Sequence, residues 1–186
     1  MTIPIRNLYC LFLYAWARFP GGTVGEVGID DSPDLPNLLA KLLSVGVRRL
    51  VRRGLDRGYK TATEEIIGPR GRLRLDRMIK EVTPLRGTAV CDFDELTHDV
   101  LLNQVLKSTL LNLSSCVDVE RETRHDLRLL AKRFHDVEDI RLSAGLFRQI
   151  AISRNSREYV FLIRVCEFVF WSLLPDERGA SPPLTR

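Results

Sequence analysis

Four segments of this chain carry apolar residues at helical spacing, and they limit the possible folds more than any other feature. They run from Leu35 to Val51, from Val100 to Leu113, from Thr123 to Phe134 and from Tyr159 to Leu174. Apolar residues that recur every three or four positions form one stripe along a helix, which is buried against other elements. The chain is therefore expected to be mainly helical.

Both ends of the helical region have distinct features. Asn7–Phe19 is expected to form a buried first helix, because Pro20-Gly21-Gly22 ends its apolar stripe. Tyr159–Leu174 is apolar on nearly every side, so other parts of the protein must cover it. A membrane-spanning helix needs about 20 apolar residues and would not readily carry Arg164 and Glu167, so a buried helix is expected here.

A small sheet is expected between the first two long helices. Tyr59–Ile67 and Arg70–Leu75 have strand character, and Gly68-Pro69 between them is a turn signal, so they are expected to form a hairpin. In the second strand Gly71, Leu73 and Leu75 would face inward. Thr88–Phe93 is expected to be a further strand. The sequence predicts an α+β fold, mainly helical with a small antiparallel sheet.

Most of the positive charge is arginine, and six arginines are candidates for contact with a partner or a phosphate. Arginine forms bidentate pairs with phosphates and carboxylates. Three candidates lie at the end of the first long helix and three on one face of the second strand, as follows: Arg48, Arg52, Arg53, Arg70, Arg72 and Arg74. Two other interpretations stay open. The three helix arginines could complement the helix dipole, and the three strand arginines could pair with Glu64 and Glu65.

Four carboxylates stand just before the second helical segment, and they have two interpretations. They belong to Asp92, Asp94, Glu95 and Asp99. As cap and first-turn residues, Asp94, Glu95, Thr97 and Asp99 would bind the free N–H groups at a helix start. Alternatively, the acids could hold a divalent ion for phosphodiester cleavage, with a nearby lysine. No lysine in the chain stands two residues after an acid, as restriction-type nucleases usually require, so the capping interpretation is favoured.

Composition limits the class of protein. The 186 residues are 45% hydrophobic and 28% charged, with a formal net charge of +4, which fits a soluble protein of one domain or two small ones. The four cysteines form no CxxC pair and the three histidines are not at ligand spacing, so a zinc site is not expected. Buried reduced thiols and the lack of a signal-peptide pattern indicate a cytoplasmic protein.

Several short motifs follow one another along the chain in a distinctive order. They are Ile3-Pro4-Ile5-Arg6-Asn7-Leu8-Tyr9-Cys10-Leu11, Tyr14-Ala15-Trp16, Arg53-Gly54-Leu55 before Tyr59, Arg70-Gly71-Arg72, Cys91 to Asp99 with Asn103 and Lys107, and Arg154-Asn155 before Tyr159. In this order and spacing they resemble one protein family, the McrC-type proteins, and the resemblance extends from about Ile3 to Glu177. McrC is the nuclease-bearing subunit of GTP-driven systems that restrict DNA containing 5-methylcytosine.

The resemblance implies a protein of two halves. The N-terminal half would dock on a hexameric AAA+ GTPase, McrB, and stimulate it, and the C-terminal half would be a PD-(D/E)XK nuclease. This chain ends where the nuclease half is expected, so it is interpreted as a fragment, a truncated gene product or a stand-alone adaptor. In a full-length protein the other half could cover part of the Tyr159–Leu174 helix.

These inferences lead to one leading hypothesis and two alternatives. Residues 1–177 are expected to form a McrC-like interaction domain and residues 178–186 a flexible tail. The domain would be non-catalytic, with no catalytic or metal-binding residues; it could meet DNA through the complex, and no membrane contact is expected. GTP and Mg would belong to the McrB-like partner, and Mg also to the missing nuclease half. The alternatives are a metal-dependent endonuclease that uses the Asp92–Asp99 acids and a direct DNA-binding module.

Overall fold

The computed structural model describes residues 11, 14, 35–150 and 157–173. Its chain forms two compact units. The helical unit comprises the described residues up to Asp56 and from Leu101 onward, and the sheet unit comprises Arg57–Val100. The α+β fold, mainly helical with a small antiparallel sheet, is thereby confirmed.

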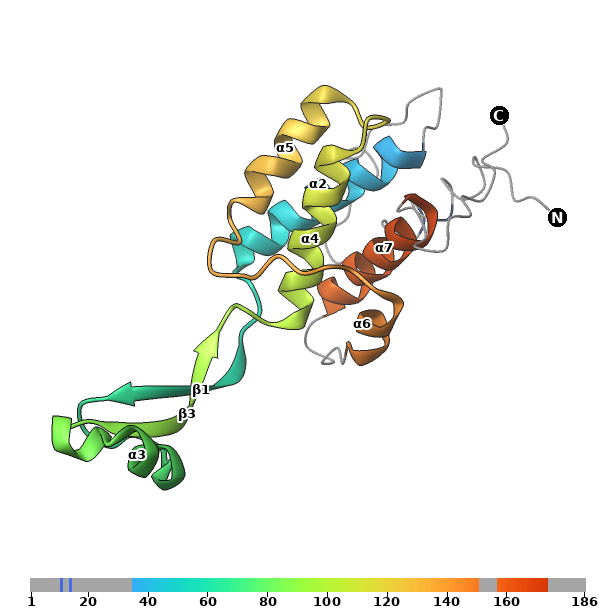
Figure 1. Ribbon diagram of the computed structural model, residues 1–186. Helices are drawn as coiled ribbons and strands as arrows, with labels where there is room; N and C mark the ends of the chain where they lie inside the picture. Colours follow the sequence, from blue (N-terminus) through green and yellow to red (C-terminus); the bar gives the residue numbers. More distant parts are fainter. Residues whose placement is uncertain (1–10, 12–13, 15–34, 151–156, 174–186) are drawn as a thin grey trace. The chain divides into compact units, whose positions relative to one another are not determined.

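The helical unit contains five described helices that pack around one core (Figure 1). These are α2 (Leu35–Arg53), α4 (Leu101–Ser115), α5 (Arg121–Ala131), α6 (Ala144–Gln149) and α7 (Arg157–Leu173). Helices α2, α4, α5 and α7 supply most of the buried side chains. The four helical segments predicted from apolar spacing correspond to these four helices.

Helix α2 shows how the apolar spacing produces the core. Its buried positions include Leu35, Leu39, Leu42, Leu43 and Val47, which recur every three or four residues. Burying one such leucine contributes about 1.5–3 kcal/mol relative to leaving it exposed. The helix ends before Gly54, whose φ of +103° suits the left-handed position that commonly follows a helix.

Helix α7 is mostly buried, as its apolar sequence predicts. Tyr159, Leu162, Val165, Cys166 and Val169 are among its buried residues. Complete covering is not observed, because Val160 and Trp171 remain exposed along the helix. Among the described helices, none combines the length and the apolar character that crossing a bilayer requires.

A closed set of three hydrogen bonds, one buried and two partly buried, joins α4 and α7 to the segment that leaves α2. The hydroxyl of Tyr159 donates to Asn103 Oδ1 at 2.6 Å, and Asn103 Nδ2 donates to the carbonyl oxygen of Asp56 at 2.9 Å. The backbone N–H of Asp56 donates to the Tyr159 hydroxyl at 2.9 Å. Burial raises the pKa of Tyr159 to about 12, so its hydroxyl stays protonated and can donate. We call this set the Asn103 triangle.

The sheet unit is built on three antiparallel strands in the order β1-β3-β2. Strand β1 (Gly58–Ile66) pairs along its whole length with β3 (Ala89–Thr97). The short strand β2 (Arg72–Leu73), the helix α3 (Leu75–Glu81) and the 3₁₀ helix η2 (Thr83–Arg86) lie between them in the sequence.

The predicted hairpin between the first two strands is wrong. Strand β2 has only two residues and pairs with β3, where Arg72 lies opposite Asp92 and Leu73 opposite Cys91. A helix begins at Leu75, so the predicted strand Arg70–Leu75 is too short to pair with β1 along its whole length. Strand β3, by contrast, pairs with β1 over nine residues. Leu73 and Leu75 are also exposed rather than turned inward. The longer β1–β3 ladder satisfies more backbone hydrogen-bonding groups.

The predicted helix start at the acidic stretch is also wrong. Strand β3 continues to Thr97 and helix α4 begins only at Leu101, so Asp94 and Glu95 are strand residues and not caps. Cross-strand hydrogen bonds explain the difference, because the hydroxyls of threonines on β1 donate to carboxylates on β3. At the strand end, the N–H of Asp99 donates to Thr97 Oγ1.

Other sequence predictions fall on residues that the structure does not describe. Of the predicted helix Asn7–Phe19, only Leu11 and Tyr14 are described; both are helical, and Leu11 is exposed rather than buried. The predicted tail, residues 178–186, lies outside the described residues, and the predicted extent of the domain, residues 1–177, stays a prediction.

We predict that Asn103→Ala lowers the free energy of unfolding by about 2–3 kcal/mol, because it leaves the Asp56 carbonyl without its donor and Tyr159 without its acceptor. Urea unfolding followed by circular dichroism measures this change. The matched control is Asn112→Ala, since Asn112 lies exposed on the same helix. Equal losses in the two variants would show that the Asn103 triangle contributes nothing specific.

Candidate functional site

The carboxylate of Asp92 lies in the middle strand of the sheet and is fully engaged by neighbouring side chains. Thr63 Oγ1 donates to its Oδ1 at 2.7 Å, and Arg74 Nη1 donates to its Oδ2 at 3.3 Å. The alternation of side chains along β3 places Asp94 on the same face, where Thr61 Oγ1 donates to it at 2.8 Å. These two acids therefore bind protein donors on one face of the sheet.

The other two acids of the sequence cluster lie elsewhere. Glu95 is exposed opposite Lys60 in the strand register, on the face opposite to Asp94. Asp99 follows the strand and forms an ion pair with Lys60 at 2.7 Å. The four carboxylates of the alternative nuclease hypothesis do not converge on one point. Within the described part of the chain, no group of three or more His, Cys, Asp or Glu residues is arranged to hold a metal ion.

Arg74 connects this face to the start of α3. Its guanidinium donates two hydrogen bonds to Asp76, both at 3.1 Å, in addition to the bond to Asp92. The bonds from Arg74 lower the pKa of Asp76 to about 2, and the two carboxylates raise the pKa of Arg74 above its ordinary value. The pKa of Asp92 is lowered chiefly by the Thr63 hydroxyl and secondly by Arg74. All three groups stay charged near neutral pH.

A shallow hollow lies beside the short strand β2. Gly71 has a φ of +72°, and a Cβ atom there would lie 2.3 Å from the carbonyl oxygen of Asp92, so only glycine fits. The Arg70 guanidinium stacks 4.6 Å from the centroid of the Phe93 ring. Arg72 is exposed, and its charge contributes to lowering the pKa of Asp92. The hollow is lined by Thr61, Arg70, Gly71, Arg72, Asp92, Phe93 and Asp94.

The three candidate arginines of α2 differ in their partners. Arg48 forms an ion pair with Asp126 at 3.0 Å, and Arg53 forms one with Glu158. Arg52 is exposed, and no described carboxylate lies within ion-pair distance of it. The alternative interpretation, in which the strand arginines pair with Glu64 and Glu65, is not observed, because Glu65 binds Arg86 and Thr88 instead.

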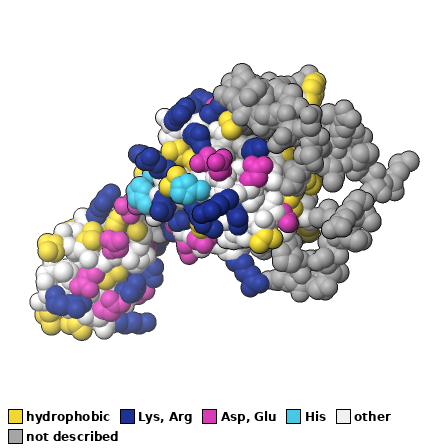
Figure 2. All heavy atoms as spheres, turned by 90° about the horizontal axis from the view of Figure 1, so that it is seen from above, with side chains coloured by type: hydrophobic (Ala, Val, Ile, Leu, Met, Phe, Trp, Pro, Cys, Tyr) yellow, Lys and Arg dark blue, Asp and Glu magenta, His cyan; other side chains and the backbone are white. Residues whose placement is uncertain are grey.

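Sequence reasoning missed one exposed apolar surface of the sheet unit. Helix α3 has no buried residue, and its Leu75 and Ile79 are 61% and 77% exposed. Val82, just before η2, is 51% exposed, and Leu85, within η2, is 86% exposed. We call these four residues the α3–η2 apolar surface, and Figure 2 shows hydrophobic side chains among charged ones on this unit. The i, i+4 spacing of Leu75 and Ile79 is a helical signal that could have indicated this surface, but Leu75 was predicted to belong to a strand.

Comparisons with known proteins give a consistent result. A family model described as "McrBC 5-methylcytosine restriction system component" matches residues 16–179. The chain is 30% identical over 178 residues to the type IV methyl-directed restriction enzyme EcoKMcrBC of Escherichia coli (strain K12). The alignment covers 95% of this chain and 51% of that protein, so the chain spans about half the length of this curated relative.

Two solved structures contain chains with a similar fold. One is the cryo-EM structure of the Thermococcus gammatolerans McrBC complex, with a TM-score of 0.67, 20% identity and coverage of 88% of this chain and 50% of that one. The other is a refined half-complex from a tetradecameric assembly of Thermococcus gammatolerans McrB AAA+ hexamers with bound McrC. There the TM-score is 0.67, the identity 20% and the coverage 88% and 40%. These matches establish likeness of fold.

We predict that Gly71→Ala destabilises the sheet unit by several kcal/mol, because it adds a clash with the Asp92 carbonyl to the cost of a left-handed alanine, which alone is about 1–2 kcal/mol. Amide hydrogen exchange along β3 reports the change. Gly87→Ala is the matched control, with a φ of +71° and open space around the added methyl. Equal acceleration of exchange in both variants would contradict the role of close packing.

We also predict that Arg74→Gln raises the pKa of Asp76 from about 2 toward its ordinary value near 3.9. A carboxyl group with a lowered folded-state pKa stabilises the fold above its unfolded-state pKa and loses that effect as pH falls through the folded-state value. Between about pH 4 and pH 2, the free energy of unfolding of the variant should therefore depend less on pH than that of the unaltered chain. Carboxyl NMR titration measures the shift, and Arg77→Gln, whose side chain pairs with Glu81, should leave it unchanged.

Proposed function

The chain belongs to the McrBC 5-methylcytosine restriction system component family, and from this premise we propose that it docks on and stimulates a McrB-like AAA+ GTPase. It would do so as the non-catalytic, McrC-like part of a system that restricts modified DNA in the cytoplasm. In one solved complex that contains the same fold, McrC is bound to McrB AAA+ hexamers. GTP and Mg would belong to the partner.

The α3–η2 apolar surface is the observation that carries this proposal. Exposed apolar side chains that gather in one place on a small unit commonly mark a protein interface. Two pairs of charged side chains on the same segment already bind each other, since Arg77 binds Glu81 at 2.8 Å and Arg86 binds Glu65 at 3.1 Å. An apolar centre with a satisfied polar rim is the usual composition of a stable contact between proteins.

The candidate arginines divide into two groups under this proposal. Arg48, Arg53 and Arg74 already form ion pairs within the chain, so a partner would have to compete for them. Arg52, Arg70 and Arg72 lie exposed, and no described carboxylate is within ion-pair distance of them. These three are the better candidates for pairing with an acidic residue of the GTPase or with a nucleotide phosphate.

The test is to mix the purified chain with the McrB-like GTPase of the same system and to measure co-elution and GTP turnover. We expect a stable complex and faster turnover. Ile79→Glu should weaken the complex at least about tenfold, which corresponds to about 1.4 kcal/mol, because it places a charge in the apolar contact.

The matched control is Val117→Glu, because Val117 is 83% exposed on the helical unit. Both substitutions replace exposed side chains, so neither should affect folding. Absence of co-elution and stimulation with the unaltered chain would refute the proposed function. Equal weakening of the complex by the two substitutions would show that the α3–η2 apolar surface is not part of the contact with the GTPase.

A further inference from the structure

Helix α5 separates its side chains into three sectors around the helix. The buried sector contains Thr123, Leu127, Leu130 and Ala131. The acids Glu122 and Asp126 lie one turn apart on a second sector. The third sector, which we call the α5 basic stripe, contains only basic residues: Arg121, Arg124, His125, Arg128 and Lys132.

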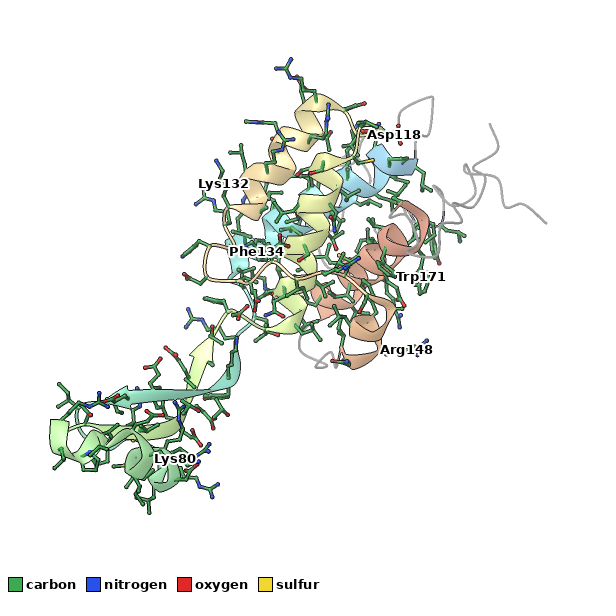
Figure 3. The ribbon with its side chains drawn as sticks, in the orientation of Figure 1. Lys80, Asp118, Lys132, Phe134, Arg148 and Trp171 are labelled. Carbon is green, nitrogen blue, oxygen red and sulfur yellow. The ribbon has the colours of Figure 1, made fainter. Side chains whose placement is uncertain are left out.

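The stripe presents about one cation per turn along the length of α5. At 1.5 Å per residue, the distance from Arg121 to Lys132 along the axis is about 16 Å. Figure 3 shows Lys132 on the outer side of α5 and Phe134 turned toward the other helices. Arg121, His125, Arg128 and Lys132 are exposed, and Arg124 is half-buried.

Nearby acids do not neutralise the stripe. Asp126 is bound by Arg48, and Glu120, just before the helix, is bound by Lys41 at 3.7 Å. No described carboxylate lies within ion-pair distance of the stripe cations; Arg128 donates to the carbonyl oxygen of Ser114. The buried Nε of Arg124 finds no hydrogen-bond acceptor among the described residues. A solvated helix face usually interleaves both signs of charge.

The charge of the chain is also unevenly distributed. Within the sheet unit, Arg57–Val100, eight Lys and Arg residues balance eight Asp and Glu residues. The formal net charge of +4 therefore belongs entirely to the sequence of the helical unit. A linear array of cations on a positively charged unit attracts a linear polyanion.

We propose that the α5 basic stripe binds the phosphate backbone of DNA without reading its sequence. Arginine and lysine side chains supply such contacts, which position a protein on DNA and carry no base information. A protein partner is a poorer match, because the described part of the stripe has only Leu129 beside it as an exposed large apolar side chain, and protein interfaces depend on apolar anchors.

The test measures the affinity of the full chain for a short fluorescent DNA duplex at several salt concentrations. We expect binding that weakens steeply between about 50 and 200 mM salt, with equal affinity for methylated and unmethylated duplexes. Arg121→Gln combined with Lys132→Gln should weaken binding about tenfold or more at low salt. It should also reduce the slope of log K against log[salt] by about 2, because two phosphate contacts are lost.

The control variant combines Lys80→Gln with Arg148→Gln, which removes the same charge from exposed positions outside the stripe (Figure 3). It should retain the affinity and the salt slope of the unaltered chain. No binding by the unaltered chain at low salt would overturn the proposal. So would equal weakening by both variants, or equal affinity for a polyglutamate of matched charge, which would indicate an acidic protein surface.

Discussion

The Asn103 triangle is the interaction on which the arrangement of the helical unit depends most. It joins the start of α4, the start of α7 and the backbone at Asp56, where the chain leaves the helical unit. Buried polar groups of this kind are costly when one partner is missing, so the three bonds specify one arrangement of these elements. Asn103 and Tyr159 both belong to the motifs that resemble McrC-type proteins. The hydrogen bonds that they form give these two residues a structural role in the helical unit.

The two units differ in how they use their apolar residues. The helical unit buries leucines and valines from four helices in one core, whereas the sheet unit exposes Leu75, Ile79, Val82 and Leu85 around a few small buried side chains. Its charges are balanced and mostly paired, while the helical unit carries the net positive charge. This difference favours separate roles, with protein contact on the sheet unit and phosphate contact on α5.

The sequence predicted the helices well and the sheet poorly, for physical reasons. Helical apolar spacing is a local signal, and it located α2, α4, α5 and α7. Strand pairing depends on contacts between distant residues, so neither the β1–β3 ladder nor the position of Asp92 and Asp94 within it was visible. The acids resembled helix caps because Thr97 and Asp99 stand near a helix start, while the bonds from Thr61 and Thr63 that hold the strand extended come from β1.

The proposed contact with the GTPase lies on the sheet unit. Hydrogen–deuterium exchange of the chain, alone and with the McrB-like GTPase and GTP, tests it most directly. We expect the partner to slow exchange in residues 67–86, which include α3 and η2, and to leave exchange in α5 unchanged. Slower exchange confined to the helical unit, with residues 67–86 unaffected, would contradict it.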